Sequence, residues 1–292
     1  MKKPLFTGVC TALVTPFLNG QVNYPLLEQL LRRQMEAGIK SVVIAGTTGE
    51  APTLTEDEKL EMFRRAKAFT GDDCMIIAGT GSNSTAHALH LSRQAQEAGV
   101  DAVLVVSPYY NKATADGLYA HYLAIAHGVE IPVILYNVPS RTGVDIPVSV
   151  YRRLSRIPNI AGVKEATGDI TKITAIRHAC GDEFTVWSGN DEMTVASIAL
   201  GAKGIISVAS NVTPEMTIAM TEAALDGDLD TASALQTELL PLHELLFCEA
   251  NPIPVKAAMG CIGYDCGACR LPLSPLSKSN EARMIEYFRR KG

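Results

Sequence analysis

Short apolar runs alternate with longer amphipathic stretches along the whole chain. Each run is rich in β-branched side chains and ends in a polar or glycine-rich turn. Near-continuous apolar runs of this kind are typical of strands that are covered on both faces, as in a parallel sheet. The runs lie at residues 8–16, 41–46, 74–79, 101–108, 132–139, 160–166, 184–189 and 204–210.

The stretches between the runs carry the signals that start and stop helices. Residues 55–58 (Thr-Glu-Asp-Glu) have the spacing of a capping box, and Pro147 and Pro214 stand near expected first helical positions. Glycines follow several stretches where a helix is expected to end. Beyond about residue 227, the spacing predicts three further helices, at residues 231–247, 254–261 and 279–290.

Eight strand–helix units predict an α/β protein with a closed (β/α)8 architecture, the TIM barrel. We expect the barrel over residues 1–226 and a C-terminal helical region over residues 227–292. An open, doubly wound sheet also alternates strands and helices, but eight evenly spaced units favour the barrel. In such a barrel the chemistry lies at the carboxyl ends of the strands.

Composition and charge narrow the class of function. The chain of 292 residues has a formal net charge of −5, which argues against nucleic-acid binding. No apolar run approaches the ~18–20 residues that span a bilayer, so no membrane association is expected. The basic start is not followed by the apolar segment of a signal peptide, and seven cysteines are an odd number. These features predict a cytoplasmic protein with reduced thiols.

Two motifs give only weak indications of a bound group. Residues 79–84 (Gly-Thr-Gly-Ser-Asn-Ser) resemble a dinucleotide-binding loop but lack its third glycine. Cys266 and Cys269 have the spacing of a metal-binding pair, yet no second pair exists and the histidines form no ligand pattern. We therefore predict neither a metal nor an organic cofactor.

Lys164 stands inside the apolar run 160–166 and is the most informative residue. Because side chains alternate across a strand, Lys164 and Glu165 are expected to face opposite sides, with Gly162 leaving a gap below the lysine. Desolvation favours the neutral form of an amine, and a neutral amine attacks ketones to form imines. The alternative is a lysine paired with an acid at the strand's end.

Three further features near strand ends suggest how a keto acid is handled. Tyr136 ends the neighbouring run, and strands ~4.8 Å apart would let its phenol carry protons near Lys164. The turn 46–50 (Gly-Thr-Thr-Gly-Glu) offers backbone amides and hydroxyls to a carboxylate. The Arg141 guanidinium can bind a carboxylate through two parallel hydrogen bonds. The alternatives are a core tyrosine, an ordinary turn and a solvated loop arginine.

Five segments resemble the dihydrodipicolinate synthase (4-hydroxy-tetrahydrodipicolinate synthase) family, in order along nearly the whole chain. They are residues 46–50, 109–111, 135–143, 162–168 and 251–256. The resemblance implies condensation of pyruvate with L-aspartate 4-semialdehyde through a Schiff base on Lys164, in the diaminopimelate and lysine pathway. Tyr136, Thr47 and Tyr110 would form a proton relay, with Tyr110 entering from a neighbouring subunit of a homodimer or homotetramer.

The same resemblance implies the binding residues. Thr48, Gly189 and the backbone near Ile206 would hold pyruvate, and Arg141 would grip the carboxylate of the semialdehyde. The lysine motif is shared with N-acetylneuraminate lyase and 2-keto-3-deoxy sugar-acid aldolases, which generally lack an arginine at position 141. A barrel that binds a small acid without turnover is a third reading, although a binder needs no imine-forming amine.

One departure from the family's pattern concerns inhibition by lysine at a dimer interface. Asn83 and Tyr109 match the usual effector site, but His87 stands where a carboxylate usually pairs with the effector's ammonium. Glu56 and Lys59 occupy positions that are often histidine in sensitive enzymes. Because losing such an anion typically costs several kcal/mol, we expect weak or absent inhibition by lysine.

Overall fold

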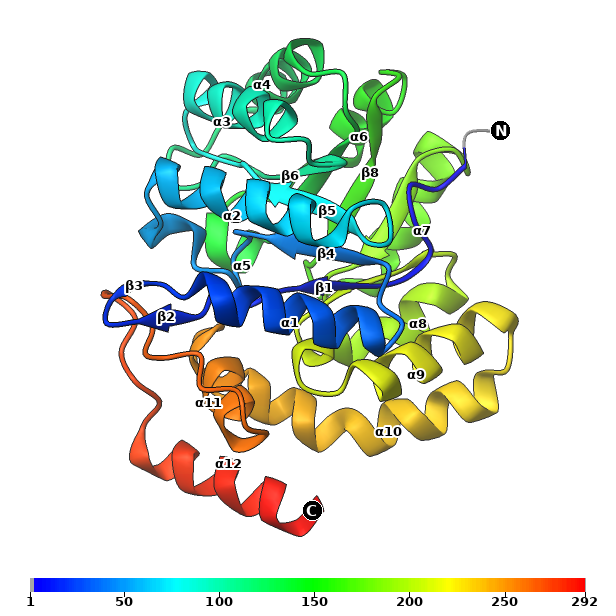
Figure 1. Cartoon of the computed structure of the whole chain (residues 1–292). Coiled ribbons are helices and arrows are strands. Elements are labelled where there is room, and N and C mark those ends of the chain that lie inside the picture. Colours follow the sequence, from blue (N-terminus) through cyan, green and yellow to red (C-terminus); the bar gives the residue numbers. More distant parts are fainter. Residues whose placement is uncertain (1–2, 292) are drawn as a thin grey trace.

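Eight parallel strands close into a barrel, which confirms the predicted (β/α)8 fold (Figure 1). The structure is a computed structural model and describes residues 3–291. Around the barrel the order is β1-β10-β9-β8-β7-β6-β5-β4, closing on β1. The strands are β1 (Gly8–Ala12), β4 (Ser41–Ile44), β5 (Met75–Gly79), β6 (Ala102–Val106), β7 (Val133–Asn137), β8 (Ile160–Glu165), β9 (Thr185–Ser188) and β10 (Gly204–Ser207).

Helices follow the strands and cover the outside of the barrel (Figure 1). The predicted capping box forms, because Thr55 Oγ1 accepts from the Glu58 amide while Glu58 accepts from the Thr55 amide. The α-helices are α1 (Tyr24–Glu36), α2 (Glu56–Thr70), α3 (Thr85–Glu97), α4 (Ala115–Gly128), α5 (Pro139–Thr142), α6 (Val148–Leu154), α7 (Ile170–Cys180), α8 (Thr194–Ala199) and α9 (Pro214–Asp226). Short 3-10 helices are η1 (Ala51–Thr53), η2 (Asp191–Met193) and η3 (Ala209–Asn211).

A small antiparallel ribbon, which is absent from the predicted elements, interrupts the first strand–helix unit. Strand β2 (Phe17–Leu18) pairs with β3 (Gln21–Val22). The two residues between them, Asn19 and Gly20, have φ angles of 52° and 78°. An Asn-Gly turn with two positive φ angles is the favoured tight hairpin connection, so the signal was present in the sequence.

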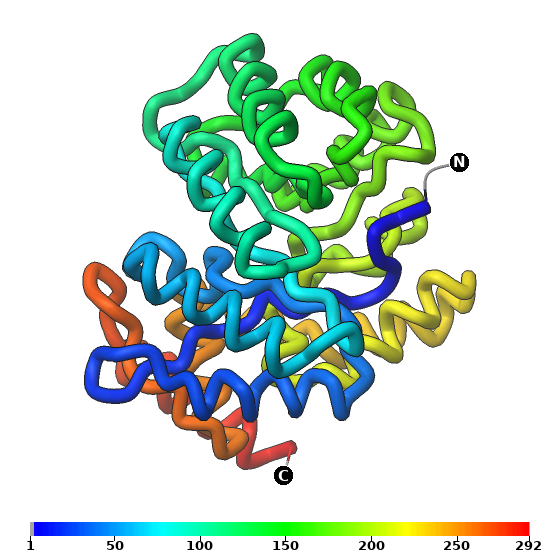
Figure 2. Tube along the Cα trace, turned by 45° about the horizontal axis from the view of Figure 1, so that its top comes forward, coloured from blue at the N-terminus to red at the C-terminus, as the bar shows by residue number. Residues whose placement is uncertain are grey.

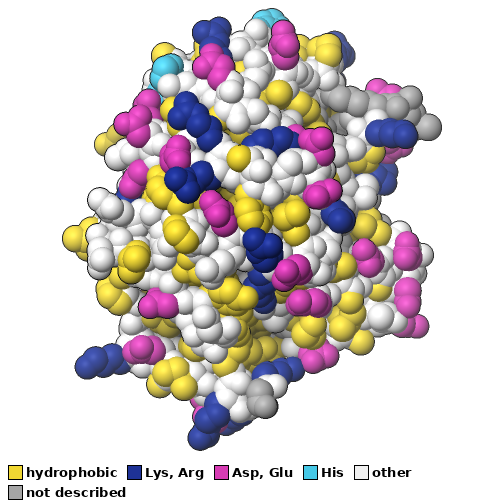
Figure 3. Space-filling view, viewed as in Figure 1, with side chains coloured by type: hydrophobic (Ala, Val, Ile, Leu, Met, Phe, Trp, Pro, Cys, Tyr) yellow, Lys and Arg dark blue, Asp and Glu magenta, His cyan; other side chains and the backbone are white. Residues whose placement is uncertain are grey.

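Three helices follow the barrel and pack together, and the first of them also packs against α8 and α9 (Figures 1 and 2). They are α10 (Leu229–Leu246), α11 (Ile253–Cys261) and α12 (Lys278–Lys291), close to the predicted ranges. No helix within residues 3–291 is long and apolar enough to cross a membrane. The face drawn in Figure 3 carries interspersed side chains of both charges.

Candidate active site

Lys164 lies at the carboxyl end of β8 and is 5% exposed. It stands in register with Tyr136 of β7 on one side and Trp187 of β9 on the other. The Lys164 Nζ is 4.6 Å from the centroid of the Tyr136 ring. The ion pairs found among residues 3–291 do not include Lys164, so the alternative of a lysine paired with an acid does not hold. Lys164 is therefore a buried amine beside a phenol.

Two glycines shape the space around this lysine. The expectation that Gly162 leaves a gap is wrong, because a Cβ at this position would lie 2.0 Å from the Thr185 carbonyl oxygen of β9. Gly162 instead lets the two strands approach closely. At the end of β9, a Cβ on Gly189 would lie 3.1 Å from Lys164 Cε. Because residue 189 has no side chain, there is room beside it for the side chain of Lys164.

The turn after β4 carries the two threonines at its centre. Thr47 lines the cavity described below, whereas Thr48 is buried and its Oγ1 accepts a hydrogen bond from Asn251 Nδ2 at 3.0 Å. Glu50 closes the turn with a φ of 57° and donates its amide to the Thr47 carbonyl at 3.1 Å. The turn is therefore held by its own backbone bond and by the side chain of Asn251.

A cavity of about 1080 Å³ opens at the carboxyl ends of the strands. Four of the predicted site residues line it: Thr47, Tyr110, Tyr136 and Arg141. The other four, Lys164, Thr48, Gly189 and Ile206, are not part of its lining. Lys164 Nζ lies over the ring of Tyr136, and the fully buried Ile206 of β10 belongs to the barrel interior with Tyr136. The predicted residues thus surround one end of the barrel.

Tyr110 and Arg141 lie at the rim of the cavity. Tyr110 has a φ of 73° and its side chain is 88% exposed. Arg141 is exposed on α5, and its Nη2 donates to the Asn251 carbonyl at 3.3 Å. Asn251, a residue without a predicted role, therefore contacts both Thr48 and Arg141. Its position at the start of the family segment 251–256 was the signal that pointed to it.

Four of the five positions compared with the family's effector site share this cavity, and Asn83 is not part of its lining. Glu56, Lys59, His87 and Tyr109 all line it. Glu56 Oε1 lies 2.8 Å from His87 Nε2, and its other oxygen lies 3.6 Å from His90 Nε2. Lys59 is mostly buried, and burial lowers the pKa of its amine while Glu56 opposes the shift. The one carboxylate among these four residues thus already faces imidazoles.

The residues considered as metal ligands do not form a site. Within residues 3–291, no group of three or more histidine, cysteine or acidic side chains could hold a metal ion. Burial raises the pKa of Cys266 to about 12 and that of Cys269 to about 11, which opposes the thiolate form that binds metals.

A closed parallel barrel with a cavity at the carboxyl ends of its strands defines a TIM-barrel enzyme. The Dihydrodipicolinate synthetase family profile matches residues 5–289. The chain is 45% identical to the 4-hydroxy-tetrahydrodipicolinate synthase of Acetivibrio thermocellus, over 96% of this chain and 95% of that protein. The chain therefore belongs to the dihydrodipicolinate synthetase family.

Solved structures agree with this assignment. The dihydrodipicolinate synthase of Aquifex aeolicus is 42% identical with a TM-score of 0.96, and the match covers 98% of both chains. The chloride-inhibited enzyme of Acinetobacter baumannii, complexed with pyruvate, is 43% identical with a TM-score of 0.95, covering 97% of this chain and 98% of that one.

Proposed function

We propose that this chain is a 4-hydroxy-tetrahydrodipicolinate synthase, which joins pyruvate to L-aspartate 4-semialdehyde through an imine on Lys164. The observation that carries the proposal is the buried Lys164 amine, without an acidic partner in residues 3–291, beside the Tyr136 ring. Near-full-length likeness to curated synthases supports this pair of substrates. The product would feed the synthesis of diaminopimelate and lysine.

The reaction needs no metal or organic cofactor, because the imine itself withdraws electrons. The Lys164 amine adds to the ketone of pyruvate, and water leaves as the imine forms. Loss of a methyl proton gives an enamine, whose carbon attacks the aldehyde carbon while the aldehyde oxygen gains a proton. The amine of the semialdehyde then attacks the imine carbon, displaces Lys164 and closes the ring.

Each proton transfer needs a hydroxyl close to the reacting atoms. Tyr136 is the phenol next to Lys164, and Thr47 and Tyr110 line the same cavity. We assign these three residues to the relay. Tyr110 would act in the site of a neighbouring subunit, and its 88% exposure with a positive φ in the single chain supports this assignment. The active unit would then be at least a homodimer.

The two substrates differ in where their carboxylates lie. We assign the carboxylate of pyruvate to Thr48 and the amides of its turn, with the backbone of Ile206 and Gly189 completing the pocket. Because Thr48 Oγ1 accepts from Asn251, its own hydrogen is available for a carboxylate oxygen. Arg141, at the rim, would hold the carboxylate of the semialdehyde.

The test is reductive trapping. Pyruvate with borohydride should add mass to the peptide that contains Lys164, and Lys164→Ala should lose both trapping and turnover. Turnover that persists in Lys164→Ala would refute the covalent mechanism. Pyruvate release from N-acetylneuraminate, without ring formation from the semialdehyde, would identify a sugar-acid aldolase instead.

A mixing experiment tests the role of Tyr110 across subunits. Lys164→Ala and Tyr110→Phe are each expected to be impaired. In a mixed dimer, one site would combine an intact Lys164 with the neighbour's intact Tyr110, so activity should partly return. If unfolded and refolded mixtures gain no activity although mixed dimers form, Tyr110 does not act across the interface.

Regulation and location complete the proposal. We expect weak or absent inhibition by lysine, because Glu56 already faces His87 at 2.8 Å and Lys59 adds a like charge to the cavity. The seven cysteines are all free, which fits a reducing compartment such as the cytoplasm.

A further inference from the structure

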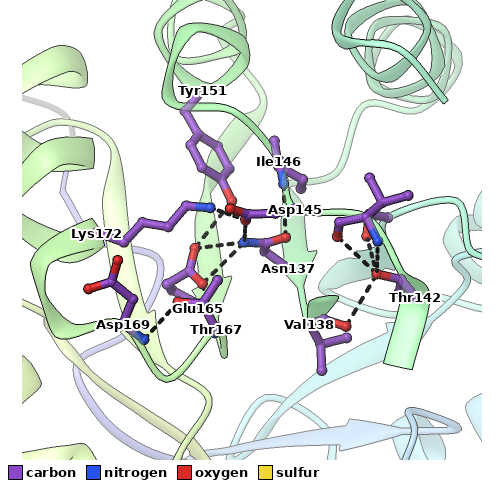
Figure 4. A network of polar contacts seen from close by, with 12 residues as sticks. Asn137, Val138, Thr142, Asp145, Ile146, Tyr151, Glu165, Thr167, Asp169 and Lys172 are labelled. Carbon is purple, nitrogen blue, oxygen red and sulfur yellow. Dashed lines mark hydrogen bonds and ion pairs between the residues drawn. The ribbon is translucent and has the colours of Figure 1, made fainter. Parts of the chain in front are cut away.

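Two buried polar side chains lie directly behind the proposed catalytic pair. Strand pairing sets Tyr136 opposite Lys164 and, one residue on, Asn137 opposite Glu165. Because alternate residues of a strand face opposite sides, the first pair points into the barrel and the second points into the layer between strands and helices. Both Asn137 and Glu165 are buried there (Figure 4).

Asn137 joins the ends of the two strands through its side chain. Its Nδ2 donates to Glu165 Oε1 at 3.2 Å and to Oε2 at 3.1 Å, and also to Asp145 Oδ1 at 2.8 Å. Its Oδ1 accepts from the Ile146 amide at 3.1 Å. One amide thus ties β7 to β8 and to the segment after α5.

Glu165 is held from two further directions (Figure 4). The Tyr151 hydroxyl of α6 donates to Oε2 at 3.2 Å, and the Thr167 amide donates to Oε1 at 2.9 Å. Lys172 of α7 completes the cluster through its ion pair with Asp145. The Glu165 carboxylate accepts all of these hydrogen bonds. Its donors lie on β7, on α6 and in the segment after β8, so three parts of the chain fix its orientation.

We propose that the Asn137–Glu165 pair positions the Lys164 amine against the Tyr136 phenol by fixing the ends of β7 and β8 relative to each other. The inference rests on the function proposed above. Lys164 has no ion pair of its own within residues 3–291, so its place depends on its strand and on the close approach of Gly189. A misplacement of about 1 Å can cost roughly 10²-fold in rate.

The experiment compares Glu165→Ala and Asn137→Ala with the wild-type enzyme. The measurements are the rate of borohydride trapping with pyruvate, kcat, the KM for each substrate and Tm. Both variants should lose tenfold or more in trapping rate and kcat. In Glu165→Ala the KM for the semialdehyde should stay within twofold, because Glu165 bonds to Asn137, Tyr151 and Thr167 and not to Arg141 or the segment after α5. Glu165→Gln should recover most of the loss, since its oxygen still accepts from Asn137 and its amide can donate to the Tyr151 oxygen.

A matched control separates positioning from general stability. Gln34 is equally buried behind β1, where it accepts from Thr11 Oγ1 at 2.8 Å and donates to the Ser210 carbonyl at 3.0 Å. Gln34→Leu should lower Tm as much as the test variants do, yet trap pyruvate at the wild-type rate. A trapping loss in Gln34→Leu equal to that in Glu165→Ala would overturn the proposal.

The remaining outcomes are also decisive. Wild-type trapping by Glu165→Ala would refute the positioning role. If Glu165→Ala does not fold, Asn137→Ala decides, because Glu165 then keeps its bonds from Tyr151 and Thr167. Lys164→Ala distinguishes failure of the proposed function from failure of the positioning role. Trapping in Lys164→Ala would refute the proposed function. The positioning role of Asn137 and Glu165 is tested only once the wild-type enzyme is shown to trap pyruvate through Lys164.

Discussion

The buried ion pair between Glu50 and Lys256 joins the turn at residues 46–50 to helix α11. Lys256 Nζ lies 2.9 Å from Glu50 Oε1, and the two side chains are 3% and 0% exposed. The Arg270 amide donates to the other oxygen of Glu50 at 2.8 Å, and the Phe17 ring covers the ammonium at 4.4 Å. Replacing Lys256 by methionine keeps the stem but leaves the carboxylate without its cation.

The size of the effect follows from this burial. Removing one partner of a buried ion pair costs about 3–5 kcal/mol, because the remaining charge is uncompensated. At about 2–4 °C per kcal/mol for a large domain, Tm should fall by at least about 6 °C in Lys256→Met. Because Glu50 closes the turn that carries Thr47 and Thr48, the KM for pyruvate should rise as well.

Urea unfolding provides the measurement. Trp187 is the only tryptophan, it is fully buried and it stacks on Phe6 at 4.7 Å, so its fluorescence reports on the barrel. Protein concentration must be held constant, because assembly contributes to stability. A loss below about 1 kcal/mol in Lys256→Met would refute the reasoning, since that is the range of exposed pairs.

Two further variants test the cause. Adding Glu50→Gln to Lys256→Met should restore part of the lost stability, because the double variant buries no lone charge. The pair between Arg290 and Glu286 on α12 has a similar distance, 2.7 Å, but is exposed. Arg290→Ala should therefore change stability by less than about 1 kcal/mol.

Three other outcomes are expected. Gly189→Ala should slow trapping on Lys164 at least tenfold and also lower Tm, because the added methyl group would lie 3.1 Å from Lys164 Cε and 2.6 Å from Ala166 Cβ; unchanged trapping would contradict this. Burial lowers the pKa of His121 from 6.5 to about 4, so the unfolded chain takes up the proton first as pH falls. The free energy of unfolding should be about 2 kcal/mol lower at pH 5 than at pH 7. If the free energy of unfolding of His121→Phe falls by the same amount between these two pH values, His121 is not the cause of the decrease. Lysine at 1 mM should leave more than half of the activity, since stronger inhibition would require binding of at least about 4 kcal/mol.

The fold was predictable because its signals are local and repeated. Each strand appears in the sequence as a separate apolar run, and the helix starts carry their own caps, such as Thr55. The main omission has a local cause too. The run 8–16 suggested one long strand, whereas β1 ends at Ala12 and the Asn19-Gly20 turn forms a separate ribbon.

The site was predictable only where neighbouring strands bring residues together. Lys164 and Tyr136 end adjacent runs, so parallel pairing places them side by side. Asn251 meets Thr48 across 203 positions of sequence, and no local pattern gives that contact. Asn137 and Glu165 did leave a signal, because polar residues inside apolar strands need buried partners.

The C-terminal helices belong to the support of the site as much as the barrel does. Two buried contacts cross from this region to the same turn: Asn251 reaches Thr48, and Lys256 reaches Glu50. Both partners on the turn are buried, so loss of these contacts would leave a hydroxyl and a carboxylate to find other partners. A barrel that ended at residue 226 would keep Lys164 and Tyr136 but lose the side chains that fix Thr48 and Glu50. Residues 227–292 are therefore expected to be required for binding pyruvate, and they are more than an appendage.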